Sequence, residues 1–243
     1  MKKYGLIGYP LSHSFSKKYF TDKFILESIK DVVYDIYPLE NINELPDLLT
    51  SEPSLCGLNV TIPYKEQVIS FLDEMSPVVK KIGACNCIKI EHGKLIGHNT
   101  DVLGFERSLL KKLKPTHSAA LVLGTGGASK AVQYVLDKQG ISFLQVSRSK
   151  SPNTISYGEL DKEIISNHLL IINTTPLGMY PNTESAPPIP YEWIGDSHYL
   201  FDLVYNPVKT MFLKKGEQQG AEIENGSDML VDQAEGSWAI WNS

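Results

Sequence analysis

The chain has 243 residues, of which 42% are hydrophobic and 21% are charged, and its net charge is −5. This is the composition of an ordinary globular protein of one or two domains, and the acidic balance argues against a nucleic-acid-binding surface. No apolar run approaches the roughly 20 residues of a membrane span and no signal peptide is recognisable, so we expect a cytoplasmic protein without a membrane partner. Three cysteines without a metal-type Cys/His spacing predict reduced thiols and no metal site.

The first half of the chain alternates predicted strands and helices. Hydrophobic spacing indicates strands over 3–9, 31–38 and 58–62, and helices from a serine-rich turn to about 28, over 41–50 and over 76–82. A hairpin around 92–93 is expected to join strands over 84–90 and 94–97, and a helix follows over 101–113. This half is therefore expected to be an α/β domain.

Three hydroxyls, at Ser12, Ser14 and Ser16, stand together where the first helix begins. A serine at a helix start commonly caps free backbone N–H groups, and one cap is enough. Hydroxyls beside a helix N-terminus also make a mild site for a carboxylate. The spacing alone leaves both interpretations open.

Asn59 and Thr61 alternate with apolar residues, so their side chains share one face of a predicted strand. Pro63 ends that strand and is expected in the first turn of a following helix. Lys65 then lies near the carboxyl end of the strand, where open α/β sheets bind ligands. A solvated surface lysine is the competing interpretation.

Residues 119–136 indicate a strand, a glycine turn and a helix. An apolar run over 119–123 is followed at once by glycines at 124, 126 and 127. Gly124 permits a tight turn, and Gly126 lets backbone N–H groups approach a pyrophosphate at the positive end of the helix. Ser129 replaces the third glycine of the usual fingerprint but is small enough for close helix–strand packing. A glycine turn that binds nothing is the alternative.

A second strand is expected over 140–146, and it ends in Ser147, Arg148, Ser149 and Lys150. An NAD site usually carries Asp or Glu there, to accept a hydrogen bond from the ribose 2′-hydroxyl. Here the position offers a guanidinium, which can bind a 2′-phosphate bidentately. The pattern favours NADP over NAD, and a solvated basic turn is the alternative.

The rest of the chain continues the alternation of strands and helices. Strands are expected over 169–172, 199–203 and 221–223, with a helix to about 215 and a final helix opened by Gly226. Such alternation is typical of a parallel sheet covered by helices.

Seven motifs, taken in order, closely resemble the shikimate dehydrogenase family over nearly the whole chain. They are Gly8-Tyr-Pro-Leu-Ser-His-Ser-Phe-Ser16, Asn59-Val-Thr-Ile-Pro-Tyr-Lys65, Gly83-Ala-Cys-Asn86, Gly97-His-Asn-Thr-Asp101, Gly124-Thr-Gly-Gly-Ala128, Asn173-Thr-Thr-Pro-Leu-Gly-Met179 and Gly226-Ser-Asp-Met-Leu-Val-Asp-Gln-Ala234. The second and fourth motifs are the most specific to that family.

The resemblance implies an α/β protein of two domains with a cleft between them. An N-terminal substrate domain would span 1–100 and be completed by a C-terminal helix over 227–243, and a Rossmann-like NADP domain would span 101–226. The implied activity is the NADPH-dependent, reversible reduction of 3-dehydroshikimate to shikimate, on the chorismate pathway to aromatic amino acids. The partner would be this small molecule, and the protein a monomer or homodimer.

The resemblance also implies a role for individual residues. Lys65 and Asp101 would be catalytic, although capping of the helix that follows would by itself explain Asp101. The substrate would be bound by Ser14, Ser16, Thr61, Asn86, Asp101, Tyr205 and Gln233. The cofactor would be bound by Gly124, Thr125, Gly126, Gly127, Ala128, Ser129, Ser147, Arg148, Ser149, Leu203, Gly226 and Met229.

The chain departs from the family pattern at two of these stretches. Lys17 follows Ser16 where the family usually has proline, and Ser147-Arg148-Ser149 stands where it often has Asn-Arg-Thr. Two rival functions stay open: a quinate or broader polyol dehydrogenase that uses NAD, and a non-catalytic NADP-binding sensor. Arg148 argues against the first, and the retained pair of Lys65 and Asp101 argues against the second. Which of those two residues transfers the proton is left open.

Overall fold

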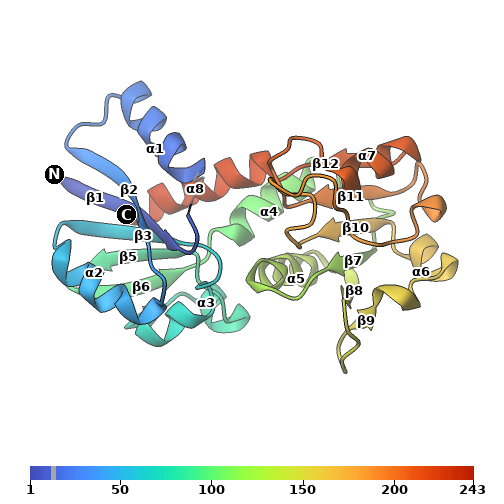
Figure 1. Cartoon of the computed structure of the whole chain (residues 1–243), viewed down its shortest axis with the longest axis horizontal. Coiled ribbons are helices and arrows are strands. Elements are labelled where there is room, and N and C mark those ends of the chain that lie inside the picture. Colours follow the sequence, from blue (N-terminus) through green and yellow to red (C-terminus); the bar gives the residue numbers. More distant parts are fainter. Residues whose placement is uncertain (12–14) are drawn as a thin grey trace. The chain divides into compact units, whose positions relative to one another are not determined.

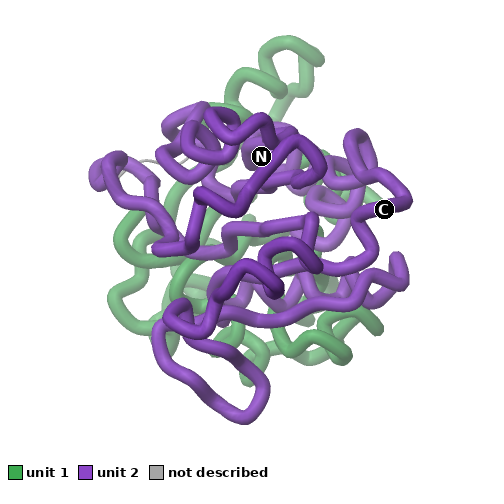
Figure 2. The backbone as a smooth tube through the Cα atoms, turned by 90° about the vertical axis from the view of Figure 1, so that its right-hand side faces the viewer, with its two compact units in different colours: residues 1–100, 234–243 green, residues 101–233 purple. Residues whose placement is uncertain are grey.

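The computed structural model describes residues 1–11 and 15–243 (Figure 1). The predicted substrate residue Ser14 lies outside the described residues. The chain divides into two compact units (Figure 2). Unit 1 comprises residues 1–100 and 234–243, and unit 2 comprises residues 101–233.

Unit 1 is built on a six-stranded mixed sheet with the order β2-β1-β3-β5-β6-β4. β1 runs parallel to β2 and β3, whereas β5 is antiparallel to both β3 and β6. The strands are β1 (Lys2–Gly8), β2 (Val32–Pro38), β3 (Leu55–Val60), β4 (Glu74–Met75), β5 (Cys87–Glu91) and β6 (Lys94–His98). The predicted hairpin is confirmed, with a turn at His92 and Gly93 between β5 and β6.

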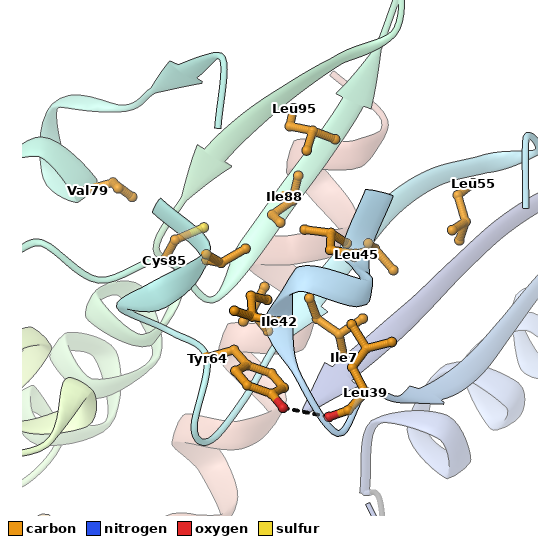
Figure 3. Close-up of a cluster of buried hydrophobic side chains, with 13 residues drawn as sticks. Ile7, Leu39, Ile42, Leu45, Leu55, Tyr64, Val79, Cys85, Ile88 and Leu95 are labelled. Carbon is orange, nitrogen blue, oxygen red and sulfur yellow. Dashed lines mark hydrogen bonds between the residues drawn. The ribbon is translucent and has the colours of Figure 1, made fainter. Parts of the chain in front are cut away.

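Both faces of this sheet are covered by apolar clusters. The helices are α1 (Phe15–Leu26), α2 (Leu45–Ser51) and α3 (Pro77–Ile82), with 3-10 helices at Ile42–Glu44 and Gln67–Phe71. One cluster includes Ile7, Leu58 and Ile88 (Figure 3). The other gathers aromatic side chains, among them Tyr4, Tyr34 and Trp241. The helix predicted over 76–82 is confirmed, with Ser76 as its N-cap and Gly83, at a φ of 65°, as its C-cap.

The expectation that Pro63 opens a helix is wrong. Residues after β3 form turns, and the next helical turn begins only at Gln67. Tyr64 is the reason: its buried side chain lies in the core and its hydroxyl donates to the carbonyl of Leu39 at 2.6 Å (Figure 3). Thr61 also lies just beyond β3, although its N–H still donates to the Ile7 carbonyl at 2.9 Å and so extends the pairing with β1.

Unit 2 contains a six-stranded, wholly parallel sheet with the order β12-β11-β10-β7-β8-β9. The strands are β7 (Ala119–Leu123), β8 (Ser142–Ser147), β9 (Ile155–Ser156), β10 (Leu170–Asn173), β11 (Tyr199–Asp202) and β12 (Glu222–Glu224). Read from β9 and renumbered within the unit, the order is 3-2-1-4-5-6, the doubly wound arrangement of dinucleotide-binding folds. Its switch point, where such folds bind ligands, falls between β7 and β10.

The helices of unit 2 are α4 (Asp101–Leu110), α5 (Gly127–Gln139), α6 (Lys162–Asn167), α7 (Met211–Gln218) and the first part of α8 (Ser227–Trp241), with 3-10 helices at Tyr157–Glu159 and Tyr191–Trp193. Helices α5, α6 and α7 connect strands of this sheet, whereas α4 precedes β7 and α8 follows β12. The sequence did not predict β9 or α6. Both are short, and too few residues repeat in them for a hydrophobic period to emerge.

Helix α8 is divided between the two units, because unit 2 ends at Gln233 and unit 1 resumes at Ala234. The first turns of α8 belong to unit 2 because they pack on α4. A Cβ on Gly104 would clash with the carbonyl of Met229, and Lys111 forms an ion pair with Asp228 at 2.5 Å. The last turns belong to unit 1, where the Trp241 indole N–H donates to the Ile88 carbonyl at 2.9 Å.

Candidate functional site

The glycine turn of unit 2 is shaped by the strand beside it. Gly124 has a φ of +114°, which L-residues rarely adopt, and a Cβ there would lie 2.7 Å from Thr174 Oγ1. Thr174 follows β10, and both its N–H and its hydroxyl donate to the Leu123 carbonyl, at 2.9 and 2.7 Å. The turn therefore lies at the switch point of the sheet.

Gly126 is the glycine of this turn at which a side chain would meet no other atom. Its φ is −78°, which any residue adopts, and a Cβ would meet no atom within 4 Å. It is exposed and forms the N-cap of α5, where the first N–H groups of a helix have no partner along the chain. The absence of a side chain leaves the backbone here open to the close approach of an anion.

Ser129, at the position of the third glycine, is buried beneath this turn and stabilises it by hydrogen bonds. It is fully buried, and both its N–H and its hydroxyl donate to the Gly126 carbonyl, at 2.9 and 2.7 Å. Gln145 on β8 joins it by donating to the Gly124 carbonyl at 2.9 Å and to the Ser129 hydroxyl at 3.3 Å. Gln145 carried no sequence signal, because an isolated polar residue on a strand is common.

The two cations of the basic turn after β8, Arg148 and Lys150, differ in their interactions. Lys150 forms an ion pair with Glu159, and that contact is the main reason why the pKa of Glu159 falls to about 2. Arg148 is exposed, and among the described residues it has no hydrogen-bond or ion-pair partner. The Ser147 hydroxyl donates to the Ser149 carbonyl and so holds the turn closed. Arg148 is therefore the cation of this turn that is available to an anionic ligand.

A buried polar network follows the ends of β10 and β11, and the sequence analysis missed its centre. Asp202 is fully buried and accepts hydrogen bonds from Asn173 Nδ2 at 2.9 Å, Val204 N at 3.0 Å and Thr210 Oγ1 at 2.5 Å. Asn173 Oδ1 in turn accepts from the N–H and the hydroxyl of Thr175, at 3.0 and 2.6 Å. An aspartate that directly ends an apolar strand was the signal that could have identified this group.

Two predicted cofactor residues are brought together beside this network. A Cβ on Gly226 would clash with the carbonyl of Leu203, so the backbones of these residues are in close contact. Met229 is buried one turn into α8, and Tyr205 is half-buried, with its pKa raised by burial. Asp101, at the start of α4, and Gln233, on α8, are buried residues of the same unit.

In unit 1, a chain of hydrogen bonds connects the predicted substrate residues Ser16 and Asn86. The Ser16 side chain is hydrogen-bonded to Tyr34, and the Tyr34 hydroxyl donates to Asn59 Oδ1 at 2.9 Å. Asn59 Nδ2 donates to Ser237 Oγ at 2.8 Å and to the Asn86 carbonyl at 3.3 Å.

Thr100 closes this chain. Its N–H donates to Asn86 Oδ1 at 2.7 Å, Asn86 Nδ2 donates to its hydroxyl at 3.1 Å, and that hydroxyl lies 3.2 Å from Ser237 Oγ. Every residue in this chain of hydrogen bonds is at most 8% exposed. Ser16 lies inside α1, so its contact with Tyr34 favours an internal role over the capping interpretation. Tyr34 and Ser237 carried no sequence signal, whereas Asn59 and Thr100 belong to the motifs.

Lys65 is placed by the core beneath it. Its carbonyl accepts from Cys85 N at 2.7 Å, and the preceding Tyr64 is anchored in the core by its bond to Leu39 (Figure 3). The side chain is half-buried, at the carboxyl end of the parallel strands of unit 1. Thr61 lies on the same turn, and its methyl group would clash with a Cβ on Gly8. Among the residues that the structure covers, no group of His, Cys, Asp and Glu could hold a metal ion.

Comparisons with known proteins agree with this architecture. Residues 6–88 match the model of the shikimate dehydrogenase substrate binding domain. A protein of Methanococcus maripaludis named shikimate dehydrogenase (NADP(+)) is 38% identical over 99% of this chain and 91% of its own length. The crystal structure of shikimate dehydrogenase from Aquifex aeolicus is 32% identical, covers 100% of this chain and 92% of its own, and superimposes with a TM-score of 0.89.

A second structure, the Thermus thermophilus shikimate 5-dehydrogenase in complex with NADP(H) and shikimate, is 29% identical. It covers 99% of this chain and 93% of its own, with a TM-score of 0.86. The similarity therefore extends over both units and over nearly the full length of the relatives. This chain belongs to the shikimate dehydrogenase family.

Proposed function

We propose that this chain catalyses the NADPH-dependent, reversible reduction of 3-dehydroshikimate to shikimate, in the chorismate pathway to aromatic amino acids. The observation that carries the proposal is the glycine turn at the switch point of a sheet of dinucleotide-binding order, where the backbone at Gly126 is open to a ligand. Family membership, with relatives named for NADP and shikimate, supplies the identity of the ligands.

Unit 2 is proposed to bind the cofactor. The N–H groups that open α5 would hold the pyrophosphate, and Arg148 would bind the 2′-phosphate because its guanidinium is exposed and not engaged in an ion pair. Leu203, Gly226 and Met229 would lie along the nicotinamide. Ser129 would act indirectly, by holding the turn through the Gly126 carbonyl.

Unit 1 is proposed to bind the substrate. Ser14 and Ser16 would hold the carboxylate, and Thr61 and Asn86 the ring hydroxyls, with Tyr205 and Gln233 of unit 2 also contributing. The buried hydrogen-bond chain supports this assignment, because it restricts the rotamers of Ser16 and Asn86 before substrate arrives. Preorganised side chains lose little conformational entropy on binding.

Lys65 and Asp101 are proposed as the proton-transfer pair. Reduction of a ketone requires a hydride and a proton, and NADPH supplies the hydride when bound. A lysine can supply the proton to the forming alkoxide, because its pKa responds to burial and to its neighbours. A carboxylate can orient that lysine and a substrate hydroxyl. The backbone contacts that place Lys65 support its role, because they hold the residue in one position.

The physiological setting is proposed from the cysteines. Cys85 and Cys87 are buried and form no disulfide, which suits the reducing cytoplasm. In the described part of the chain, no helix is both long enough and apolar enough to cross a membrane. We expect a monomer or a homodimer, which light scattering behind size-exclusion chromatography would distinguish.

The test is the absorbance of NADPH formed from shikimate and NADP⁺ by the purified protein. We expect turnover with this pair, and much slower turnover when NAD⁺ replaces NADP⁺ or quinate replaces shikimate. Faster turnover of quinate with NAD⁺ would identify a polyol dehydrogenase instead. Binding of NADP⁺ with no turnover of any pair, or turnover unchanged by Lys65→Ala, would contradict the proposed chemistry.

A further inference from the structure

Asp202 is a buried carboxylate for which the proposed mechanism has no use. It lies at the carboxyl end of β11, fully buried, and accepts three hydrogen bonds, all from neutral groups of Asn173, Val204 and Thr210. Among the residues that the structure describes, no cation forms an ion pair with it. Burial raises its pKa to about 6, and the hydrogen bonds oppose that rise. At pH 7 to 8 it therefore carries an uncompensated negative charge.

The acidic residues of the neighbouring strand β12, Glu222 and Glu224, both form ion pairs with Lys112. Asn173 faces it from β10 and Thr210 from the start of α7, and neither titrates. Tyr191, on the 3-10 helix at Tyr191–Trp193, also interacts with Asp202, and its pKa is raised, first by its own burial. It therefore stays neutral below pH 9. Lys215 lies over the Tyr191 ring, with Nζ 4.8 Å from the ring centroid.

The charge lies beside the segment proposed to line the nicotinamide. Leu203 is the next residue, and the Gly226 N–H donates to the Val204 carbonyl at 3.2 Å. An oxidised nicotinamide ring carries one positive charge, whereas the reduced ring is neutral. A fixed negative charge nearby therefore interacts differently with the two forms, and only such a difference can shift an equilibrium between them.

We propose that the Asp202 carboxylate makes unit 2 discriminate between the two redox forms of its cofactor, favouring NADP⁺ over NADPH relative to a neutral residue at this position. This inference rests on the proposed function. We expect an effect of roughly tenfold on the ratio of the two binding constants, which corresponds to about 1.4 kcal/mol of charge interaction. Protonation of Asp202 removes the effect, so the ratio of the two affinities depends on pH.

The experiment measures the dissociation constants of NADP⁺ and NADPH separately, by equilibrium titration between pH 5 and 8. For the wild-type chain we expect the ratio of the NADP⁺ constant to the NADPH constant to rise about tenfold as the pH falls through 6. The 2′-phosphate also titrates near pH 6, but it is present on both forms and cancels in the ratio. Asp202→Asn should show the higher ratio at every pH, with no dependence on pH.

Asp196→Asn is the matched control. Asp196 is exposed and precedes β11, whereas Asp202 is the last residue of that strand. The variant therefore removes the same charge at the amino end of the strand instead of the carboxyl end. For Asp196→Asn, the ratio of the NADP⁺ constant to the NADPH constant should equal that of the wild-type chain at every pH. A second variant, Thr210→Val, keeps the carboxylate but removes the hydroxyl that donates to it, so the midpoint of the pH dependence should move to higher pH.

The possible outcomes are distinct. An Asp202→Asn ratio within about twofold of wild type at pH 8 would overturn the inference, as would an equal change in Asp196→Asn. If Asp202→Asn does not fold, a Thr210→Val midpoint equal to that of wild type would overturn it. Failure of the wild-type chain to bind either form would contradict the proposed function itself, and this inference with it.

Discussion

Two neighbouring tyrosines of unit 1 should respond oppositely to the same change, loss of the phenolic hydroxyl. Tyr4 on β1 and Tyr34 on β2 are partners in the parallel ladder, both are at most 2% exposed, and both belong to the aromatic cluster around Trp241. Their rings pack similarly: Tyr4 stacks on Trp241 at 4.7 Å and Tyr34 on Phe20 at 4.5 Å. Replacement by phenylalanine preserves these contacts, so the hydroxyls alone decide the result.

The hydroxyls differ in their partners. The Tyr34 hydroxyl donates to Asn59 Oδ1 and is hydrogen-bonded by Ser16, so Tyr34→Phe leaves a buried acceptor unsatisfied. We expect a loss of about 1–3 kcal/mol in the free energy of unfolding. The Tyr4 hydroxyl is buried with no hydrogen-bond partner among the described residues, and burial raises its pKa to about 12. Tyr4→Phe removes a polar group that has already lost water, so it should be neutral or stabilise by up to about 2 kcal/mol.

Urea or thermal unfolding followed by tryptophan fluorescence measures the difference, because Trp238 and Trp241 report on this cluster. For a chain of this size each kcal/mol shifts Tm by roughly 2–4 °C. Tyr34→Phe should also raise KM for shikimate, since Ser16 loses the contact that orients it, whereas Tyr4→Phe should leave KM unchanged. Equal destabilisation of the two variants, or a Tyr34→Phe chain as stable as wild type, would refute the reasoning.

Three further predictions concern the remaining groups. Arg148→Ala should weaken NADPH binding by roughly ten- to a hundred-fold at unchanged kcat, because one charged hydrogen-bonding pair is lost. Lys150→Ala removes a cation that is already paired with Glu159, so it should weaken NADPH binding far less. Titration of both variants with NADPH checks this. Lys65→Ala should lower kcat by about 10²–10⁴-fold. If Lys65 and Asp101 act as a unit, the double variant Lys65→Ala/Asp101→Asn should lose far less kcat than the product of the two single losses, which steady-state kinetics measures. Because the folded pKa of Asp202 lies near 6, above its ordinary 3.8, the native protein takes up a proton between these pH values that the unfolded chain does not. The free energy of unfolding should therefore gain on the order of 3 kcal/mol from this group as the pH falls from above 6 to below 4, and urea titrations of Asp202→Asn should lack that gain.

The amino-acid sequence alone was enough to predict the elements whose apolar residues repeat over several turns or strands. The spacing of apolar residues identified β7, α5 and the β5–β6 hairpin, because burial of one face imposes a period on the sequence. The glycine turn was equally readable, since Gly124 needs a positive φ and few other residues tolerate one. Gly126 is different, because a Cβ there would meet no atom within 4 Å, so its role in binding the cofactor remains a prediction from the motif.

The grouping of polar side chains into networks became visible only in the folded chain. Tyr34 and Ser237 look like ordinary residues along the chain, and they join Asn59 only because β2, β3 and α8 meet in unit 1. Asp202 likewise acquires its raised pKa from burial beside β10 and α7, which no local pattern records. Pro63 failed as a helix signal because Tyr64 is held in the core by a residue 25 positions earlier in the chain. Long-range hydrogen bonds and desolvation depend on contacts between distant segments, so they are set by the fold and leave no periodic trace in the sequence.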